Sequence, residues 1–230
     1  MMQILVRAEP HYLDAPDILA LGQDVMAAWA CHQGSQSRVV LARVREGSAD
    51  QLWRSPSLPG LVAVRLVDSG RGTPLLATWC MEGPTRSRVV LMDPDSEDRV
   101  QIENMAECCA VALKGGVVAV VGRRGESVVL SFLDRDGSLR EEPVCDPGVR
   151  VFHPSLATTP DGGLLVVWEQ ESYPGCGIFA RQRDGQGQWG PVTRLDDGDV
   201  TCHVPEASSH PRGVLVCYHA PARFPEPQLL

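Results

Sequence analysis

Three histidines stand at corresponding places along the sequence, each just before a short segment of small residues: His11, His153 and His203. Imidazole nitrogens are common ligands of divalent metals, and a carboxylate often completes such a site. If the three segments converge in space, these histidines predict a divalent metal site with Asp14 or Glu206 as a further ligand. The alternative is that they are turn residues that hydrogen-bond to neighbouring backbone.

A second group of candidate residues follows Trp168. Glu169 and Tyr173 lie in what the sequence indicates is the longest loop, residues 169–176. Polar loop residues on a rigid scaffold often bind ligands, although a solvated loop is the simpler interpretation. The ligand-binding candidates of the whole chain are Asp17, His153, His203, Glu206, Glu169 and Tyr173.

The elements that must position these residues come from an internal repeat. Five apolar runs recur at spacings of 42 to 50 residues and end at positions 29, 79, 121, 168 and 218. A second run follows each of the first four, and Ser37–Leu41 is identical to Ser87–Leu91 at the same offset. A segment of small residues precedes each of the five. Runs of four to six β-branched residues separated by polar turns are typical of β-hairpins.

A fourth, weaker strand closes most repeats, at residues 51–53, 99–102 and 191–195. Four antiparallel strands at this spacing predict the blade of a β-propeller. We therefore expect an all-β fold, a single β-propeller domain over residues 1–230 with about five four-stranded blades. The alternatives are a β-sandwich whose period is coincidental and a part of a longer propeller.

The expected blades span residues 14–57, 58–102, 103–146, 150–197 and 202–230. The last of these has only two strands of its own. Residues 3–8 precede the first blade, and we expect them to supply the missing outer strand of the last one. Such closure would remove the open edge of that sheet.

The fourth repeat resembles the sialidase-type, or BNR, propeller repeat. The resemblance rests on His153–Ala157, the turn Asp161–Gly163, Val166–Trp168 and Ile178–Arg181, followed by Asp184 and Trp189 at the spacing of the family's Asp-box. Gln182 and Gln186 replace the Ser and Gly of that box. The resemblance implies the fold, with Asp184 capping a turn, and not the activity, because the arginine triad and the Tyr–Glu pair of sialidases have no counterparts.

The expected blade number is also similar to that of arabinanase-type glycosidases. That resemblance implies an acidic residue on the first inner strand of the opening blades. Asp14 and Asp17 stand in such a place, as do Glu103 and Glu107 before the third blade. Two carboxylates across a funnel suit general acid–base catalysis of glycoside hydrolysis. Asp14, Asp17 and Glu107 are therefore the candidate catalytic residues, although such enzymes are larger and have long loops that shape a sugar cleft.

Charge and composition restrict the partners. The formal net charge of −8 disfavours nucleic acid and acidic membrane surfaces, because both require a basic face. No run of 18 apolar residues and no signal peptide is present, so we expect a cytoplasmic location and eight cysteines that are reduced and mostly buried.

Fold alone does not define function. The first hypothesis is a non-catalytic recognition or scaffold module that binds a protein, peptide or carbohydrate at the channel mouth. The second is a glycoside hydrolase-like or metal-dependent enzyme with its site at the same mouth. A divalent metal is the one cofactor that the sequence indicates, and the sequence does not define the oligomeric state.

Overall fold

The computed structural model describes residues 12–13, 16–46, 48–70, 72–83, 86–96, 99–172, 175–198 and 201–220. Within these ranges the chain consists of β-strands and one short 3₁₀ turn, η1 (Lys114–Gly116). The prediction of an all-β fold is confirmed. No helix in this part of the chain is long and apolar enough to span a membrane.

The strands form five antiparallel sheets, here named A to E in chain order. Sheet A contains β1 (Tyr12–Leu13), β2 (Asp17–Leu21), β3 (Asp24–Gln33), β4 (Gln36–Arg45), β5 (Ser48–Arg54) and β6 (Leu58–Pro59). Sheet B contains β7 (Leu61–Val67), β8 (Leu75–Met81), β9 (Ser87–Met92) and β10 (Arg99–Glu103). Sheet C contains β11 (Ala106–Ala112), β12 (Val118–Arg124), β13 (Ser127–Leu133) and β14 (Leu139–Pro143).

Sheet D contains β15 (Val151–Thr158), β16 (Leu164–Ser172), β17 (Gly175–Arg183) and β18 (Trp189–Arg194). Sheet E contains β19 (His203–His210) and β20 (Gly213–His219). In sheets B, C and D each strand pairs with the next one along the chain, which is the four-stranded meander of a propeller blade.

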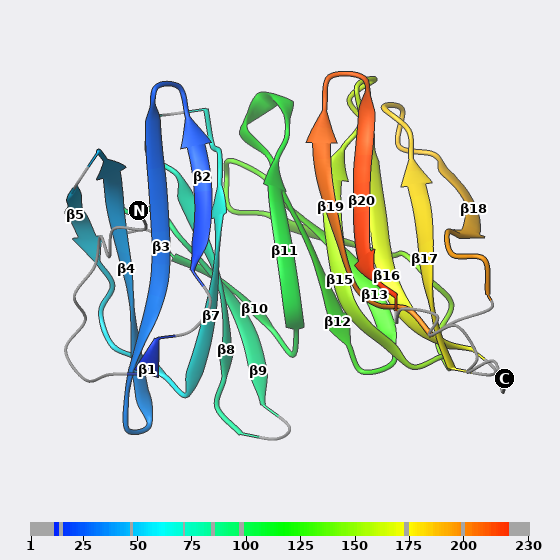
Figure 1. The fold of residues 1–230 in the computed structure, drawn as a ribbon, viewed down its shortest axis with the longest axis horizontal. Helices are drawn as coiled ribbons and strands as arrows, with labels where there is room; N and C mark the ends of the chain where they lie inside the picture. Colours follow the sequence, from blue (N-terminus) through cyan, green and yellow to red (C-terminus); the bar gives the residue numbers. More distant parts are fainter. Residues whose placement is uncertain are drawn as a thin grey trace, which may run out of the picture.

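The first long strands of successive sheets lie next to one another. β2 contacts β7, β7 contacts β11, β11 contacts β15, and β15 contacts β19. Figure 1 shows the same arrangement, with these inner strands toward the middle and the outer strands β5 and β18 at opposite edges. The radial order of strands therefore brings residues far apart in sequence to a common centre.

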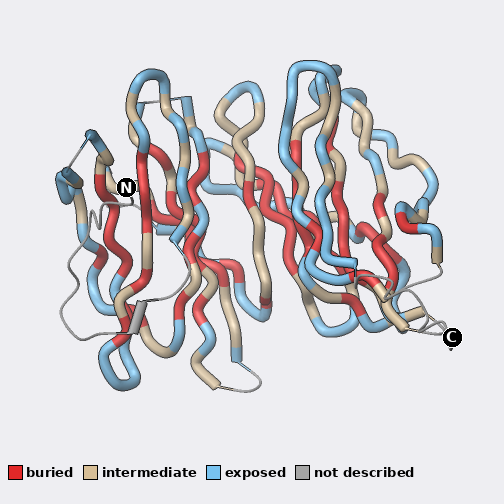
Figure 2. The backbone as a smooth tube through the Cα atoms, viewed as in Figure 1, coloured by how far each residue is buried: buried red, intermediate tan, exposed pale blue. Residues whose placement is uncertain are grey.

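Three apolar clusters lie between neighbouring sheets, A with B, B with C, and C with D. Strand β12 shows how one strand serves two clusters: Ala119 and Val121 face sheet D, whereas Val118 and Val120 face sheet B. Alternate side chains of a strand point to opposite faces, so a strand buried on both faces has a continuous apolar sequence. Sheet E contributes no described residue to these clusters, and its loops and edge are exposed in Figure 2.

The pairing register corrects the alignment of the third repeat by one residue. Val121 pairs with Cys109, as Val167 pairs with Ser155, so Gly122 is the counterpart of Trp168. A Cβ on Gly122 would lie 2.4 Å from Cγ of Met105. The fully buried Met105 side chain thus occupies the space next to the position where the fourth repeat has its aromatic ring.

The expectations for the cysteines, for Asp184 and for residues 3–8 have different outcomes. No disulfide joins the eight cysteines, but only Cys80, Cys145 and Cys202 are buried and Cys217 is exposed. The carboxylate of Asp184 accepts hydrogen bonds from the amides of Gln186 and Gln188, so it caps a turn as expected. The strand expected at residues 3–8 lies outside the described residues.

Candidate functional site

The inner strands of sheets C, D and E share an unusual bulge. The pairing register shifts between Ala106 and Cys109, between Phe152 and Ser155, and between His203 and Glu206. At each bulge one residue has a positive φ: Glu107 at 54°, His153 at 46° and Val204 at 50°. Positive φ is rare outside glycine and re-aims the local backbone.

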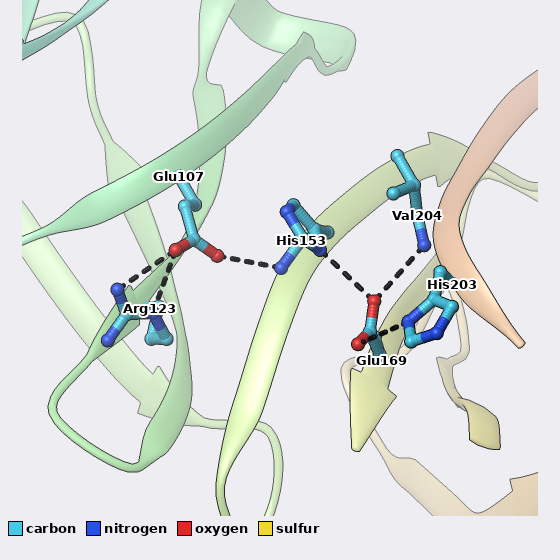
Figure 3. Close-up of polar contacts among 6 residues, drawn as sticks. All are labelled: Glu107, Arg123, His153, Glu169, His203 and Val204. Atoms are coloured by element: carbon cyan, nitrogen blue, oxygen red, sulfur yellow. Dashed lines mark hydrogen bonds and ion pairs between the residues drawn. The ribbon is translucent and has the colours of Figure 1, made fainter. Parts of the chain in front are cut away.

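Two of these bulges direct a backbone N–H toward a carboxylate. The amide of His153 donates to Oε2 of Glu107 at 2.7 Å. The amide of Val204 donates to Oε2 of Glu169 at 3.1 Å. Figure 3 shows both contacts, which join sheet C to sheet D and sheet D to sheet E. The bulges therefore build a line of polar contacts across the inner ends of three sheets, from Glu107 through His153 and Glu169 to Val204, here called the polar line.

Glu107 is held from its own sheet as well. Both Nε and Nη2 of Arg123 donate to its Oε1, at 3.2 and 2.9 Å. Since its other oxygen accepts from His153, both carboxylate oxygens are engaged (Figure 3). A carboxylate held in this way on both oxygens acts as a structural anchor between sheets C and D.

Glu169 lies between two imidazoles, in strand β16 and not in the loop that the sequence indicated; only 4% of it is exposed. His203 contacts its Oε1 through Nδ1 at 2.9 Å, and His153 contacts its Oε2 through Nδ1 at 3.1 Å. Burial alone would raise the pKa of the Glu169 carboxyl. Hydrogen bonds from His203, the Val204 amide, His153 and Cys176 outweigh burial and hold that pKa below its ordinary value.

The two histidines take a defined tautomer as a result. An ionised carboxylate only accepts hydrogen bonds, so each Nδ1 that contacts Glu169 carries the proton. In the neutral imidazole this leaves the lone pair on Nε2. The side chains of His153 and His203 are each 47% exposed, so both rings have an accessible side.

A pocket of about 200 Å³ lies beside this polar line, where strands of sheets B, C, D and E converge. Its apolar lining includes Ala63, Trp79 and Pro205, and its polar lining includes Arg65, Glu107, His153, Ser155 and Glu206. It is smaller than the 300–1,000 Å³ or so of pockets that hold drug-sized ligands, so it suits one small group or the end of a chain.

Arg65 links three inner strands at this pocket. Its Nη2 donates to Oε1 of Glu206 at 2.9 Å, and its Nη1 lies 3.8 Å from Oδ1 of Asp17. Burial opposes the charged form of Arg65, but the carboxylates of Glu206 and Asp17 outweigh it and raise the pKa of the guanidinium. Asp17 also accepts a hydrogen bond from the Leu66 amide at 2.6 Å, which ties β2 to β7.

The pocket thiols are unsuited to nucleophilic chemistry. Burial raises the pKa of Cys108 to about 12, and burial also raises the pKa of Cys109. The thiolate is the reactive form of cysteine, so both groups are inert at neutral pH.

Most of the predicted site residues come together. Glu107, His153 and Glu206 line the pocket, Asp17 reaches it through Arg65, and Glu169 and His203 adjoin it through His153. His11, Asp14 and Tyr173 lie outside the described residues, so the metal site of three histidines stays a prediction. His153 and His203 do meet, but on a shared carboxylate.

Sequence reasoning missed three participants: Arg65, Arg123 and Ser155. Arg65 is the only charged residue of β7, whose other six residues are aliphatic, and that interruption was an available signal. Arg123 and Ser155 carried none, because their roles depend on bulges that the sequence does not mark.

Known proteins resemble this chain in fold but not in sequence. No protein-family model matches the sequence, and no curated protein matches it. Among solved structures, the α-L-arabinofuranosidase Arb93A of Fusarium graminearum, bound to an iminosugar inhibitor, aligns with a TM-score of 0.59 at 10% identity, over 90% of this chain and 76% of that one. The polysaccharide lyase Uly1 aligns with a TM-score of 0.58 at 10% identity, over 91% of this chain and 55% of that one.

A lectin from Aleuria aurantia, bound to Fucα1-6GlcNAc, aligns with a TM-score of 0.52 at 10% identity, over 91% of this chain and 72% of that one. The chain thus spans little more than half of the lyase and about three quarters of the arabinofuranosidase and the lectin. The shared fold is the propeller, and this protein is therefore a β-propeller. At such low identity the likeness defines the fold alone.

Proposed function

We propose that the protein is a carbohydrate-recognition propeller that binds sugar hydroxyl groups in the pocket around Arg65 without cleaving the sugar. The observation that carries the proposal is the pair of Arg65 and Glu206 beside the partly exposed Trp79. A hydroxyl both donates and accepts, so beside this pair it can accept a hydrogen bond from the guanidinium and donate one to the carboxylate. An aromatic ring offers an apolar surface to the C–H face of a sugar.

The charges of the pocket favour a neutral sugar. Two carboxylates, Glu107 and Glu206, line it against one guanidinium of Arg65. A uronic acid would meet like charge there, whereas neutral hydroxyls would not. The arabinofuranosidase, the lyase and the lectin are named for carbohydrate substrates or ligands, which supports carbohydrate as the class of ligand.

Recognition is preferred over hydrolysis because the pocket carboxylates are committed to other contacts. Glu107 is held by Arg123 and His153, and Glu206 by Arg65 and Ser155. A glycosidase needs a carboxylic acid that donates a proton to the leaving group, whereas both of these carboxylates accept hydrogen bonds from the groups that hold them.

The test is a panel of neutral and uronic-acid oligosaccharides, screened on an array and measured by calorimetry. We expect a neutral glycan to bind, and Arg65→Ala or Glu206→Gln to weaken it about 10- to 100-fold, because a hydrogen bond to a charged group contributes about 1.5–3 kcal/mol. Arg45→Ala is the matched control, since Arg45 forms an exposed ion pair with Asp50 away from the pocket. Binding unaffected by the pocket variants, or no binding by any glycan, would overturn the proposal.

The second candidate function is glycoside hydrolysis, favoured by the presence of two carboxylates, Glu107 and Glu206, in one pocket. The same panel distinguishes the two. Incubation of a bound glycan with the wild-type protein, followed by chromatography of the products, should show intact ligand. Cleavage that Glu206→Gln abolishes would establish the enzyme and refute simple recognition.

A further inference from the structure

Three side chains of different chemistry converge at the junction of sheets D and E, outside the pocket. They are the carboxylate of Glu169, the thiol of Cys176 and the imidazole of His203. One ligand atom from each, an oxygen, a sulfur and a nitrogen, all lie within 4.8 Å of one another. Glu169 is buried, Cys176 is partly exposed and His203 is exposed, so the group has an open side.

The backbone brings Glu169 and Cys176 together. Glu169 pairs with Ile178 across β16 and β17, and Cys176 lies two residues before Ile178. Residues two apart on a strand share a face, so Cys176 is the diagonal neighbour of Glu169. The carboxylate and the thiol therefore converge because of the strand register, and no unusual side-chain conformation is needed.

The third ligand is placed by the approach of sheet E. The amide of Cys202 donates to the carbonyl of Cys176 at 3.0 Å, which sets His203 beside the thiol. A Cβ on Gly175 would lie 2.1 Å from Oγ1 of Thr201, so glycine is required for this close approach. Three separate strands thus fix the three donor atoms.

The ligand set matches a borderline-soft divalent metal. Zinc is bound in proteins by cysteine sulfur, histidine nitrogen and carboxylate oxygen, most often with four ligands. One carboxylate and one thiolate would balance the two positive charges of the ion. Calcium and magnesium, which take oxygen ligands, do not fit this set.

The second oxygen of Glu169 is already oriented. Its Oε2 accepts from the Val204 amide at 3.1 Å and lies 3.1 Å from Nδ1 of His153, whereas Oε1 faces His203. Carboxylates that bind a metal are usually held by such hydrogen bonds from second-shell groups. His153 would therefore act as a positioning residue and not as a ligand.

We propose that Glu169, Cys176 and His203 bind one zinc-type divalent ion, which clips sheet E to sheet D. On binding, the Cys176 thiol releases its proton to solvent and its sulfur bonds to the metal. The proton on Nδ1 of His203 moves through solvent to Nε2, so that Nδ1 can bind the ion, and no oxidation or reduction occurs. The fourth position is open to water. Such a clip would stabilise the attachment of sheet E, which contributes no described residue to the apolar clusters between the other sheets.

The experiment uses the full chain without a histidine tag, stripped of metal with a chelator and titrated with Co²⁺. We expect one ion per chain, a thiolate-to-cobalt charge-transfer band, and its loss on addition of Zn²⁺. Added Zn²⁺ should also raise the melting temperature, because an ion that binds only the folded state stabilises it.

Matched variants make the outcome decisive. Cys176→Ser should abolish the charge-transfer band and weaken Zn²⁺ binding by more than about 100-fold, whereas His153→Gln should weaken it only about 10- to 100-fold as a second-shell change. Cys217→Ser and His210→Gln, exposed residues of sheet E, should change neither. Each variant is first shown to melt cooperatively without metal.

A missing band in the wild-type protein, or a band that Cys176→Ser retains, would overturn the proposal. The result is independent of carbohydrate recognition. Glycan binding by wild-type protein that takes up no metal would refute the clip alone, and metal uptake without glycan binding would refute recognition alone.

Discussion

Two junctions of the propeller use the same bulge in opposite ways. In sheet C the bulge residue is the acid, Glu107, and its cross-strand partner is the base, Arg123. In sheet D the bulge residue is the base, His153, and the partner in the equivalent position is the acid, Glu169. In both cases the carboxylate also accepts the amide of the next sheet's bulge residue. Each junction therefore needs a carboxylate to accept the amide of a bulge residue. In sheet C that carboxylate lies on the bulge itself, and in sheet D it lies on the neighbouring strand.

The surroundings of the two carboxylates differ more than their partners. The junction of sheets C and D also contains an apolar cluster with Phe132 and Trp168, and Glu142 of sheet C accepts hydrogen bonds from Arg183 and Trp189 of sheet D. Fully burying one large apolar side chain contributes about 1.5–3 kcal/mol, so that cluster dominates its junction. The junction of sheets D and E has no cluster among the described residues, so it depends on polar contacts.

The largest expected effect follows from replacing Glu169 by glutamine. The carboxylate of Glu169 accepts hydrogen bonds from the Val204 amide and from two imidazoles on its two oxygens. Glutamine has one acceptor oxygen, so it can replace only part of these hydrogen bonds. We expect a loss of about 2–4 kcal/mol in the free energy of unfolding, measured by denaturant titration with a chelator present. Hydrogen exchange should show that the amides of sheet E open first.

Glu171→Gln is the control, on the same strand. Glu171 pairs with Arg150 in an exposed ion pair, and its loss should cost less than about 0.5 kcal/mol. Equal effects of the two variants, or protection in sheet E unchanged by Glu169→Gln, would show that the polar contacts do not hold the junction.

A smaller, pH-dependent effect on the free energy of unfolding is expected at the junction of sheets C and D, from a change at Glu142. Burial opposes ionisation of Glu142, but contacts with Arg183, Trp189 and Arg140 outweigh it and lower its pKa. A lowered folded-state pKa contributes stability above the unfolded-state pKa of about 4.3 and loses it as the pH falls through the folded-state value. Glu142→Gln should therefore cost about 1–2 kcal/mol at pH 7 and progressively less as the pH falls below about 4.3.

The measurement is a series of denaturant titrations from pH 7 to pH 3 on the wild type and Glu142→Gln. A cost that is constant over that range would mean that the carboxylate charge does not contribute. Glu126→Gln provides the baseline, because Glu126 lies exposed in a turn of the same sheet.

Replacing Glu107 by glutamine should have a smaller effect still. The amide oxygen can continue to accept from the His153 amide, so only the ion pair with Arg123 is lost. Both side chains are partly exposed, at 16% and 29%, which places the expected cost near 1 kcal/mol. A double-mutant cycle with Arg123→Ala isolates the pair. A coupling near zero would contradict the role given to Arg123.

The fold could be predicted from the sequence because its signal is repeated. The continuous apolar runs follow from burial on both faces of each strand, as in β12, and the identical Ser37–Leu41 and Ser87–Leu91 fall in equivalent strands, β4 and β9. The candidate site could be predicted only in part. Glu107, His153 and Glu206 were found because they precede or lie on inner strands.

The rest depended on tertiary geometry. The bulges place Glu, His and Val at positive φ, whereas the usual marker of that conformation is glycine. Because the sequence does not show the bulges, it predicts Glu169 to be a loop residue after Trp168. Nothing in the neighbouring sequence indicates that Glu169 is the buried acceptor of two histidines. Arg65 was visible as a lone charge, but its partner Glu206 is 141 residues away.

The smallest expected effect has the opposite sign and concerns the bulge of sheet E. Val204 has a φ of 50° and is 40% exposed, so it bears left-handed strain while a large part of its side chain stays in contact with water. A left-handed conformation costs a residue with a Cβ about 1–2 kcal/mol, and glycine avoids that cost but loses about 0.5–1 kcal/mol through chain entropy.

Val204→Gly should therefore raise the free energy of unfolding by about 0.5–1 kcal/mol and keep the amide contact with Glu169. Val192→Gly is the comparison, since Val192 is similarly exposed at 46% in β18 and its φ is not positive; it should destabilise by about 1 kcal/mol. If both variants destabilise equally, the bulge of sheet E is unstrained, and the amide of residue 204 reaches Glu169 at no conformational cost.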